Sequence, residues 1–177
     1  TPAAPPVLIG HSMGGLVAQL AGNGRLTPSL MRRVPPESVR YMRLDEKRTT
    51  IVRHIELPED GEAHKFVREA VQAYPELYFS RFVILGEGDS EEVVLPRLLS
   101  AEGILADDAS VSVVPLGGRH VNHFWRLLHG LAIPHVTLLD LDLARFQGGW
   151  GRIKYAARQL LAYGDVTKAG FTGAQVK

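Results

Sequence analysis

Three apolar runs, each followed by a stretch with helical spacing, make up the second half of this chain. The runs span residues 82–85, 111–115 and 135–139, and the helical stretches span 91–100, 121–130 and 150–162. Repeated strand-then-helix units predict a parallel sheet flanked by helices, which is the α/β class. In open sheets of this class, ligands bind beyond the carboxyl ends of the strands. We therefore expect the chemistry of this chain at those ends.

The first part of the chain carries a different pattern. Apolar residues that end at Gly10 lead into a helix-compatible stretch, and two alternating runs farther on flank a charged corner. This pattern predicts a β-hairpin and a helical arm in front of the parallel sheet. The expected elements are a strand at 7–9, a sharp turn, a helix at 15–21, hairpin arms at 38–44 and 49–57, and an amphipathic helix at 62–73.

Length and composition fit an ordinary globular chain of 177 residues, 45% of them apolar. We divide it into an N-terminal segment, residues 1–77, and an α/β domain, residues 78–177, and we expect both ends to be cuts through a longer protein. The net charge of +1 excludes a global basic field, so any DNA contact needs a local patch. The absence of cysteine excludes disulfides, thiolate zinc sites and a cysteine nucleophile. No apolar run approaches the ~20 residues of a spanning helix, so we predict a cytoplasmic protein without a membrane partner.

Acidic residues gather at the carboxyl ends of two predicted strands. Glu87 follows the first strand between two glycines that allow a tight turn, and Glu91 lies four residues later in the first turn of a helix. Asp140 and Asp142 follow the third strand and alternate as in a strand extension, which would face them to the same side. Four carboxylates at one sheet edge would suit a hard cation such as Mg²⁺. A simpler reading is that Glu91 and Glu92 only complement the helix dipole.

The spacing Glu87-Gly88-x-x-Glu91, with Asp140-x-Asp142 after a later strand, resembles the TOPRIM signature of topoisomerases, primases and the OLD (overcoming lysogenization defect) nucleases. Three sequence segments are similar to the OLD family in particular: ELYFSRFVILGEGDSEEVVLP, VSVVPLGGRHVNHF and IPHVTLLDLD. The resemblance runs over about residues 27–164. It implies a TOPRIM-like fold and DNA cleavage dependent on Mg²⁺ or Mn²⁺. It also implies that the four carboxylates are catalytic metal ligands.

Members of that family join the TOPRIM nuclease to an ABC-type ATPase. The sequence contains no Gly-x-x-x-x-Gly-Lys-Ser/Thr phosphate loop, so ATP would act only through a domain absent from this chain. The resemblance implies DNA and that ATPase domain as partners, and a second copy of the chain as a further partner in a homodimer. Residues 1–77 would include the end of the ATPase domain.

Basic residues near the acidic clusters are candidates for substrate binding. Arg119 follows the second strand, and Arg145, Arg152 and Lys154 follow Asp142. Guanidinium and ammonium groups at these places could neutralise DNA phosphates. They could equally form a solvated helix face.

Two other functions stay open from the residues alone. Gly10-His11-Ser12-Met13-Gly14, between a predicted strand and helix, matches the nucleophile elbow of serine esterases and lipases. Its triad would be Ser12, Asp89 and His120, in that chain order. The third reading is a non-catalytic interaction or dimerisation module of a larger ATPase, in which Ser12 has no nucleophilic role.

Overall fold

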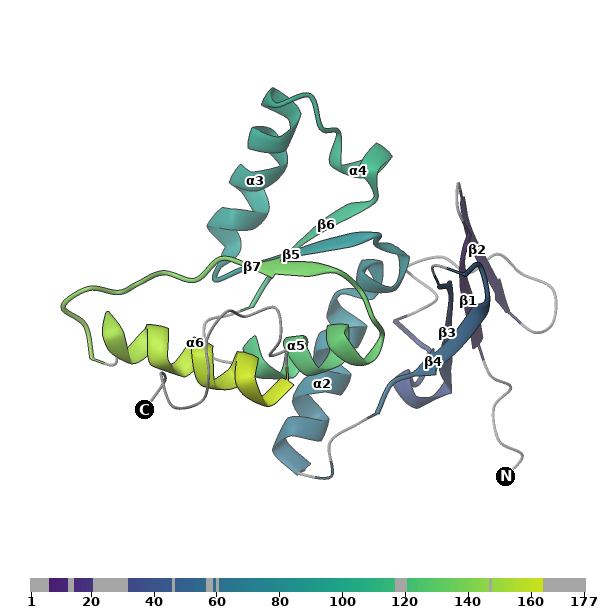
Figure 1. Cartoon of the computed structure of the whole chain (residues 1–177), viewed down its shortest axis with the longest axis horizontal. Coiled ribbons are helices and arrows are strands. Elements are labelled where there is room, and N and C mark those ends of the chain that lie inside the picture. The colour runs from purple at the N-terminus through teal and green to yellow at the C-terminus, as the bar shows by residue number, and fades with distance from the viewer. Residues whose placement is uncertain are drawn as a thin grey trace.

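The computed structural model of the chain describes residues 7–12, 15–20, 32–45, 47–56, 59, 61–116, 121–146 and 148–163. Two sheets organise these residues (Figure 1). No helix within the described ranges is both long and apolar enough to cross a membrane. The elements are β1 (Val7–Ser12), β2 (Gly15–Leu20), η1 (Pro36–Ser38), β3 (Val39–Leu44), β4 (Thr50–His54), α2 (Gly61–Ala73), η2 (Pro75–Phe79), β5 (Phe82–Gly86), α3 (Asp89–Ala101), α4 (Ala106–Ala109), β6 (Val111–Pro115), α5 (Val121–Gly130), β7 (His135–Thr137) and α6 (Trp150–Tyr163).

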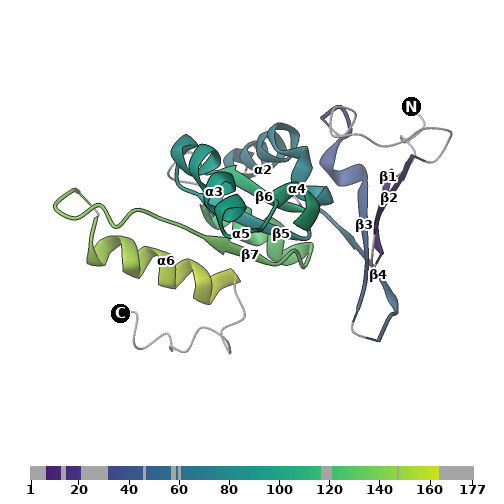
Figure 2. The same ribbon diagram turned by 90° about the horizontal axis from the view of Figure 1, so that it is seen from above.

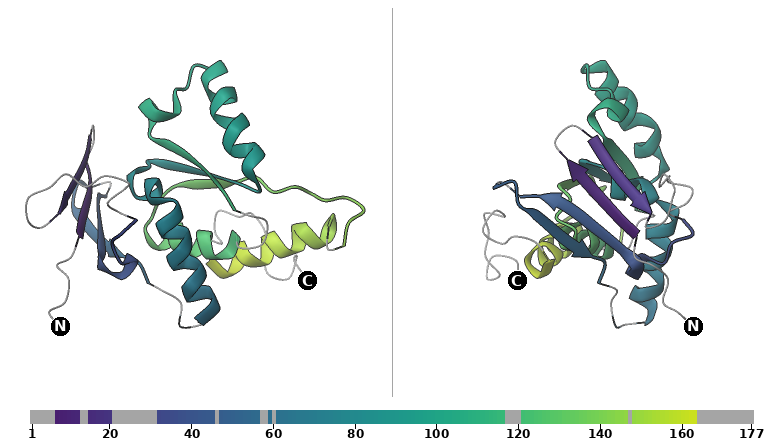
Figure 3. Two further views of the ribbon diagram at one scale, coloured as in Figure 1. Left: turned by 180° about the vertical axis from the view of Figure 1, so that it is seen from behind. Right: turned by 90° about the vertical axis from the view of Figure 1, so that its right-hand side faces the viewer.

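The predicted parallel sheet is confirmed, with β5 at its centre between β6 and β7. Helices α3 and α4 lie on one side of this sheet, and α2 and α5 lie on the other with α6 beside α5 (Figures 1 and 3). Because both faces are covered, β5 is a continuous apolar run rather than an alternating one, and its Val83 and Leu85 are fully buried. The chain therefore has the α/β architecture, a parallel sheet flanked by helices, that its strand-then-helix pattern predicts.

Helix α5 supplies much of the core beneath the sheet. Its buried residues follow helical spacing, so they form one apolar face. Trp125 on this face donates a hydrogen bond of 2.7 Å from Nε1 to Thr137 Oγ1 in β7, which satisfies the indole donor inside the core. The bond ties α5 to the strand that leads into the acidic cluster. The buried residues of α5 are Val121, Phe124, Trp125, Leu127 and Leu128.

The predicted hairpin is also confirmed, as β3 paired antiparallel with β4. Its turn is closed by Asp45, whose carboxylate accepts a 2.7 Å hydrogen bond from the Thr49 amide. Val39 and Tyr41 of β3 are buried, so this sheet contributes to the same core as the parallel sheet. The strand order is β2-β1-β3-β4, and Figure 2 shows this sheet at one end of the molecule and α6 at the other.

The expected helix at 15–21 is wrong for Gly15–Leu20, which forms strand β2. It pairs antiparallel with β1, from Val7 opposite Leu20 to Ser12 opposite Gly15, so the segment is a β-hairpin rather than strand, turn and helix. A short apolar run has too few residues for its periodicity to separate a strand from a helix. Pairing with β1 satisfies the backbone groups of β2, and this long-range gain is not visible in local spacing.

Candidate metal centre

The acidic residues predicted from the sequence lie where β5 and β7 end. These strands are parallel neighbours, so their carboxyl ends meet at one edge of the sheet. Glu87 directly follows β5, and its Oε2 accepts a hydrogen bond of 2.5 Å from the backbone amide of Asp140, three residues beyond β7. The structure thus brings together the first and the third acidic positions. It does so through the main chain of Asp140, and not through its carboxylate.

Arg152, in the first turn of α6, joins Glu87 to Asp142. Its Nη2 lies 3.0 Å from Glu87 Oε1 and also donates a short hydrogen bond to Asp142 Oδ2. The three side chains are only 19–22% exposed, so their charges are partly withdrawn from water. The hydrogen bond to Asp142 and the charge of Glu87 raise the pKa of Arg152 above its ordinary value. Two carboxylates, one directly after β5 and one in the loop after β7, therefore share one positive charge.

Glu91 serves the start of helix α3. Its Oε2 accepts a 2.8 Å hydrogen bond from the Gly88 amide, and Ser90 Oγ donates to its Oε1 at 3.2 Å. A glutamate at the third helical position that reaches back to the N-cap amide satisfies one of the orphan donors of the helix. This hydrogen bond from Gly88 is the main reason that the pKa of Glu91 is lowered. The simpler reading of Glu91 as a helix-start residue thus has a structural basis, and its role as a metal ligand stays a prediction.

Gly86 sets how closely α3 approaches the end of β5. A Cβ built on Gly86 would lie only 2.4 Å from the Cβ of Glu91, so a side chain there would push the first turn of α3 away. Glycine is needed here for the close approach and not for its backbone angles. The local sequence therefore places Glu91 beside the strand end from which Glu87 projects.

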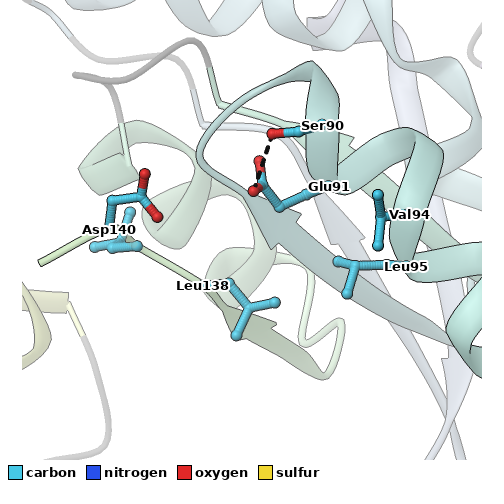
Figure 4. A pocket seen from close by; sticks show the side chains of 7 residues that line it. Ser90, Glu91, Val94, Leu95, Leu138 and Asp140 are labelled. Carbon is cyan, nitrogen blue, oxygen red and sulfur yellow. Dashed lines mark hydrogen bonds between the residues drawn. The ribbon is translucent and has the colours of Figure 1, made fainter.

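A pocket of about 390 Å³ lies between α3 and the segment that leaves β7. Figure 4 shows the carboxylates of Glu91 and Asp140 on opposite sides of this pocket, above an apolar floor. Acidic oxygens thus border a space open to a ligand. The lining residues are Ser90, Glu91, Val94, Leu95, Leu138, Leu139 and Asp140.

Asp142 reaches the site from a loop, because the strand extension expected beyond β7 does not form. Strand β7 ends at Thr137, and Asp142 has a left-handed φ of 50°, which aspartate tolerates better than most residues. The loop closes on itself through hydrogen bonds from Gly148 N to Arg145 O at 3.0 Å and from Gly149 N to Leu141 O at 2.6 Å. Asp140 and Asp142 are therefore not paired on one face of a strand.

The predicted basic residues are placed unequally. Arg145 Nη1 lies 3.6 Å from Asp142 Oδ1 but is 80% exposed, and Lys154 is exposed on α6. Arg119 lies outside the described residues, and its role stays a prediction. The cation in closest contact with the acids is Arg152, which the sequence offered only as one of several phosphate-binding candidates. Its signal was its position ten residues after Asp142 on the next helix.

The carboxylate oxygens at this edge of the sheet are suitable ligands for a hard divalent cation. Within the described ranges, no group of three or more His, Cys, Asp or Glu side chains is arranged to hold a metal ion. Glu87 and Asp142 nevertheless direct oxygens at one positively charged nitrogen, so this place already accommodates positive charge. Carboxylate oxygens are the ligands that Mg²⁺ and Mn²⁺ prefer.

The alternative serine triad loses the local context on which it depended. A nucleophile elbow needs a helix after its strand, whereas Ser12 ends β1 in a β-hairpin. β1 contacts η2, which precedes the amino end of β5, whereas Asp89 lies just beyond the carboxyl end of β5. In Figures 1 and 2, β1 lies apart from the start of α3, with the length of β5 between them. His120 and the Ser12 side chain lie outside what the structure describes.

Comparison with known families gives a match over residues 78–142 to the family described as "Overcoming lysogenization defect protein-like, TOPRIM domain". The resemblance seen in the sequence is thereby confirmed for this stretch, and it is consistent with a nuclease-type role. No curated protein matches the chain.

Solved structures of the C-terminal region of the Xanthomonas campestris pv. campestris OLD protein are also similar to the chain. The structure phased with mercury is 30% identical over 55% of this chain and 46% of that chain, with a TM-score of 0.43. The structure phased with platinum is 34% identical over 58% and 44%, with a TM-score of 0.42. The structure phased with iodine is 28% identical over 55% and 46%, with a TM-score of 0.44. This chain therefore spans less than half the length of these solved chains.

Proposed function

We propose, starting from the OLD-like TOPRIM domain of residues 78–142, that this chain is the nuclease part of a larger ATP-dependent enzyme and cleaves phosphodiester bonds of DNA with Mg²⁺ or Mn²⁺. One observation carries the proposal. Oxygens of Glu87 and Asp142, which follow two adjacent parallel strands, converge on one cationic nitrogen. Parallel sheets bind ligands at this edge, and a phosphodiester needs a concentrated positive charge beside it to be cleaved.

The residues of the chain divide the work in the proposed reaction. Glu87 and Asp142 would hold the metal ion, with Asp140 and Glu91 available from the rim of the pocket. Such an ion supplies an activated water and stabilises charge on the phosphate and the leaving oxygen. Arg145 is exposed beside Asp142, so it would contact a DNA phosphate and help to orient the backbone.

The partners are proposed on the same basis. The ATPase activity would belong to another domain of the full protein, because the phosphate-loop motif is absent from this sequence. DNA is the proposed substrate because Arg145, an exposed basic side chain, lies beside Asp142 at this edge of the sheet and could neutralise a phosphate of the backbone.

Cleavage of supercoiled plasmid tests the proposal. The full chain with Mn²⁺ should nick the plasmid, and Glu87→Gln, Asp140→Ala and Asp142→Asn should each lower the rate by at least about a hundredfold, as loss of a metal-binding group does. Glu102→Gln is the matched control, since Glu102 is an exposed acid at the opposite end of α3. Nicking that survives all three site variants would refute the proposed site.

Two parallel measurements separate the alternative functions. Hydrolysis of p-nitrophenyl acetate that disappears with Ser12→Ala would indicate an esterase. Failure of the chain to bind Mn²⁺ at all would instead favour a non-catalytic interaction module of a larger ATPase.

A further inference from the structure

Arg152 occupies an unusual position for a cationic side chain. It is the third residue of α6, in the first turn, where the helix dipole presents its positive end. Negative side chains are favoured at such a place and positive ones are not. The position of Arg152 is therefore maintained by its acidic partners and not by the helix that carries it.

The contacts of Arg152 are incomplete as well as concentrated. A single nitrogen, Nη2, serves both Glu87 Oε1 and Asp142 Oδ2, whereas a fully engaged guanidinium would use several of its five donors. Its Nε is shielded from solvent and has no hydrogen-bond partner among the described residues. Leaving such a donor unsatisfied costs free energy, which offsets part of the stabilisation that the ion pairs contribute. Such an incompletely engaged guanidinium could be exchanged for another cation.

The two acceptor oxygens define the place that Arg152 fills. Both lie within hydrogen-bonding distance of the same atom, so they are already close enough to approach one small cation. An ion liganded by Glu87 and Asp142 would lie where Nη2 lies now. The guanidinium and the ion cannot occupy that place together, because both carry positive charge and require the same oxygens.

We propose that Arg152 is the internal counter-ion of this carboxylate site in the metal-free protein, and that a divalent cation binds only by displacing it from Glu87 and Asp142. The inference rests on the proposed function, since it assumes that the site takes a metal ion. Arg152 then acts as a positioning residue that prevents the two carboxylates from separating by charge repulsion, and it lowers the affinity for metal by competition.

Competition and preorganisation predict opposite results when the charge is removed. If Arg152 competes, Arg152→Met frees both carboxylates and tightens Mn²⁺ binding by about tenfold or more, because the charge-assisted hydrogen bonds that oppose metal binding in the wild type are lost. The same variant should be less stable than the wild type in EDTA and should gain more in Tm when Mn²⁺ is added. If Arg152 only held the site in shape, the variant would bind Mn²⁺ more weakly.

The experiment is a titration of the full chain with Mn²⁺ alone, followed by the electron paramagnetic resonance signal of the free ion. Arg152→Lys retains a positive charge, so its Mn²⁺ affinity should lie between those of the wild type and Arg152→Met. Arg158→Met is the matched control, because Arg158 is exposed on the same helix, and it should bind Mn²⁺ as the wild type does. Arg152→Gln, which is neutral but can still donate one hydrogen bond, replaces Arg152→Met if that variant does not fold.

The outcomes distinguish this inference from the proposed function. Tighter binding by Arg152→Met or Arg152→Gln, abolished when Glu87→Gln is added, supports the competition. If both neutral variants bind Mn²⁺ no more tightly than the wild type, while Glu87→Gln abolishes binding in the wild type, the proposed role of Arg152 is wrong and the metal site remains supported. Absence of Mn²⁺ binding in every variant overturns both proposals.

Discussion

Gly148→Ala should displace Asp142 from the candidate site. A Cβ on Gly148 would lie 1.8 Å from the backbone oxygen of Asp142 and 3.1 Å from that of Arg145. Real Cβ atoms essentially never come within 3.0 Å of such non-bonded heavy atoms, so the loop backbone at Gly148 and at Asp142 would have to move apart by about 1.2 Å. The neighbouring hydrogen bonds from Gly148 N to Arg145 O and from Gly149 N to Leu141 O would lengthen with them.

Overpacking of this kind and weakened loop hydrogen bonds should together lower the free energy of unfolding by about 2 kcal/mol, or Tm by roughly 4–8 °C. The Mn²⁺ affinity should fall at least about tenfold, because Asp142 moves with its own carbonyl group. Thermal unfolding in EDTA and Mn²⁺ titration measure the two effects. Gly151→Ala is the control: its Cβ would meet no atom within 4 Å, and alanine favours the helix by up to about 1 kcal/mol. A Gly148→Ala protein with wild-type Tm and wild-type Mn²⁺ affinity would refute the reasoning.

Three further predictions concern neighbouring parts of the molecule. Thr137→Val should lower the free energy of unfolding by about 1–3 kcal/mol, because it leaves the buried Trp125 Nε1 without its acceptor. Urea denaturation measures this, with Thr50→Val as the exposed-site control. Equal losses of unfolding free energy in the two variants would contradict the prediction. Burial lowers the pKa of His135 below 6.5, so the unfolded chain binds the extra proton first and stability should fall as pH drops through about 6.5; His135→Asn should flatten that dependence, and an unchanged pH profile would count against it. Arg145→Ala should weaken DNA binding and reduce the slope of log affinity against log salt by about one unit, measured by fluorescence anisotropy, and an unchanged slope would exclude a phosphate contact.

The parallel half of the fold was predictable because it repeats one rule. Each strand of that sheet lies in a mainly apolar run, continuous in β5, and each following helix has apolar residues at helical spacing, as in α5. The hairpin of β3 and β4 was predictable from the polar corner that Asp45 closes. Strand β2 was not predictable, because its conformation depends on pairing with β1, and a stretch of six residues is too short for its periodicity to separate a strand from a helix.

The candidate site was predictable in its residues but not in its contacts. Positions at the carboxyl ends of β5 and β7 follow from topology alone, so Glu87 and Asp140 could be placed near each other in advance. The conformation of Asp142 could not, since a left-handed φ and a loop closed by two glycines break the alternation of a strand. The contact of Arg152 with both acids depends on where α6 begins after that loop, which local sequence does not specify.

The most direct test of the central claim is a crystal structure of the full chain with Mn²⁺, in which anomalous scattering locates the ion. We predict one peak between the carboxylates of Glu87 and Asp142, within coordination distance of both, with the Arg152 guanidinium moved off that place. A peak elsewhere on the molecule, or crystals grown in Mn²⁺ that show no peak at this edge of the sheet, would contradict the account.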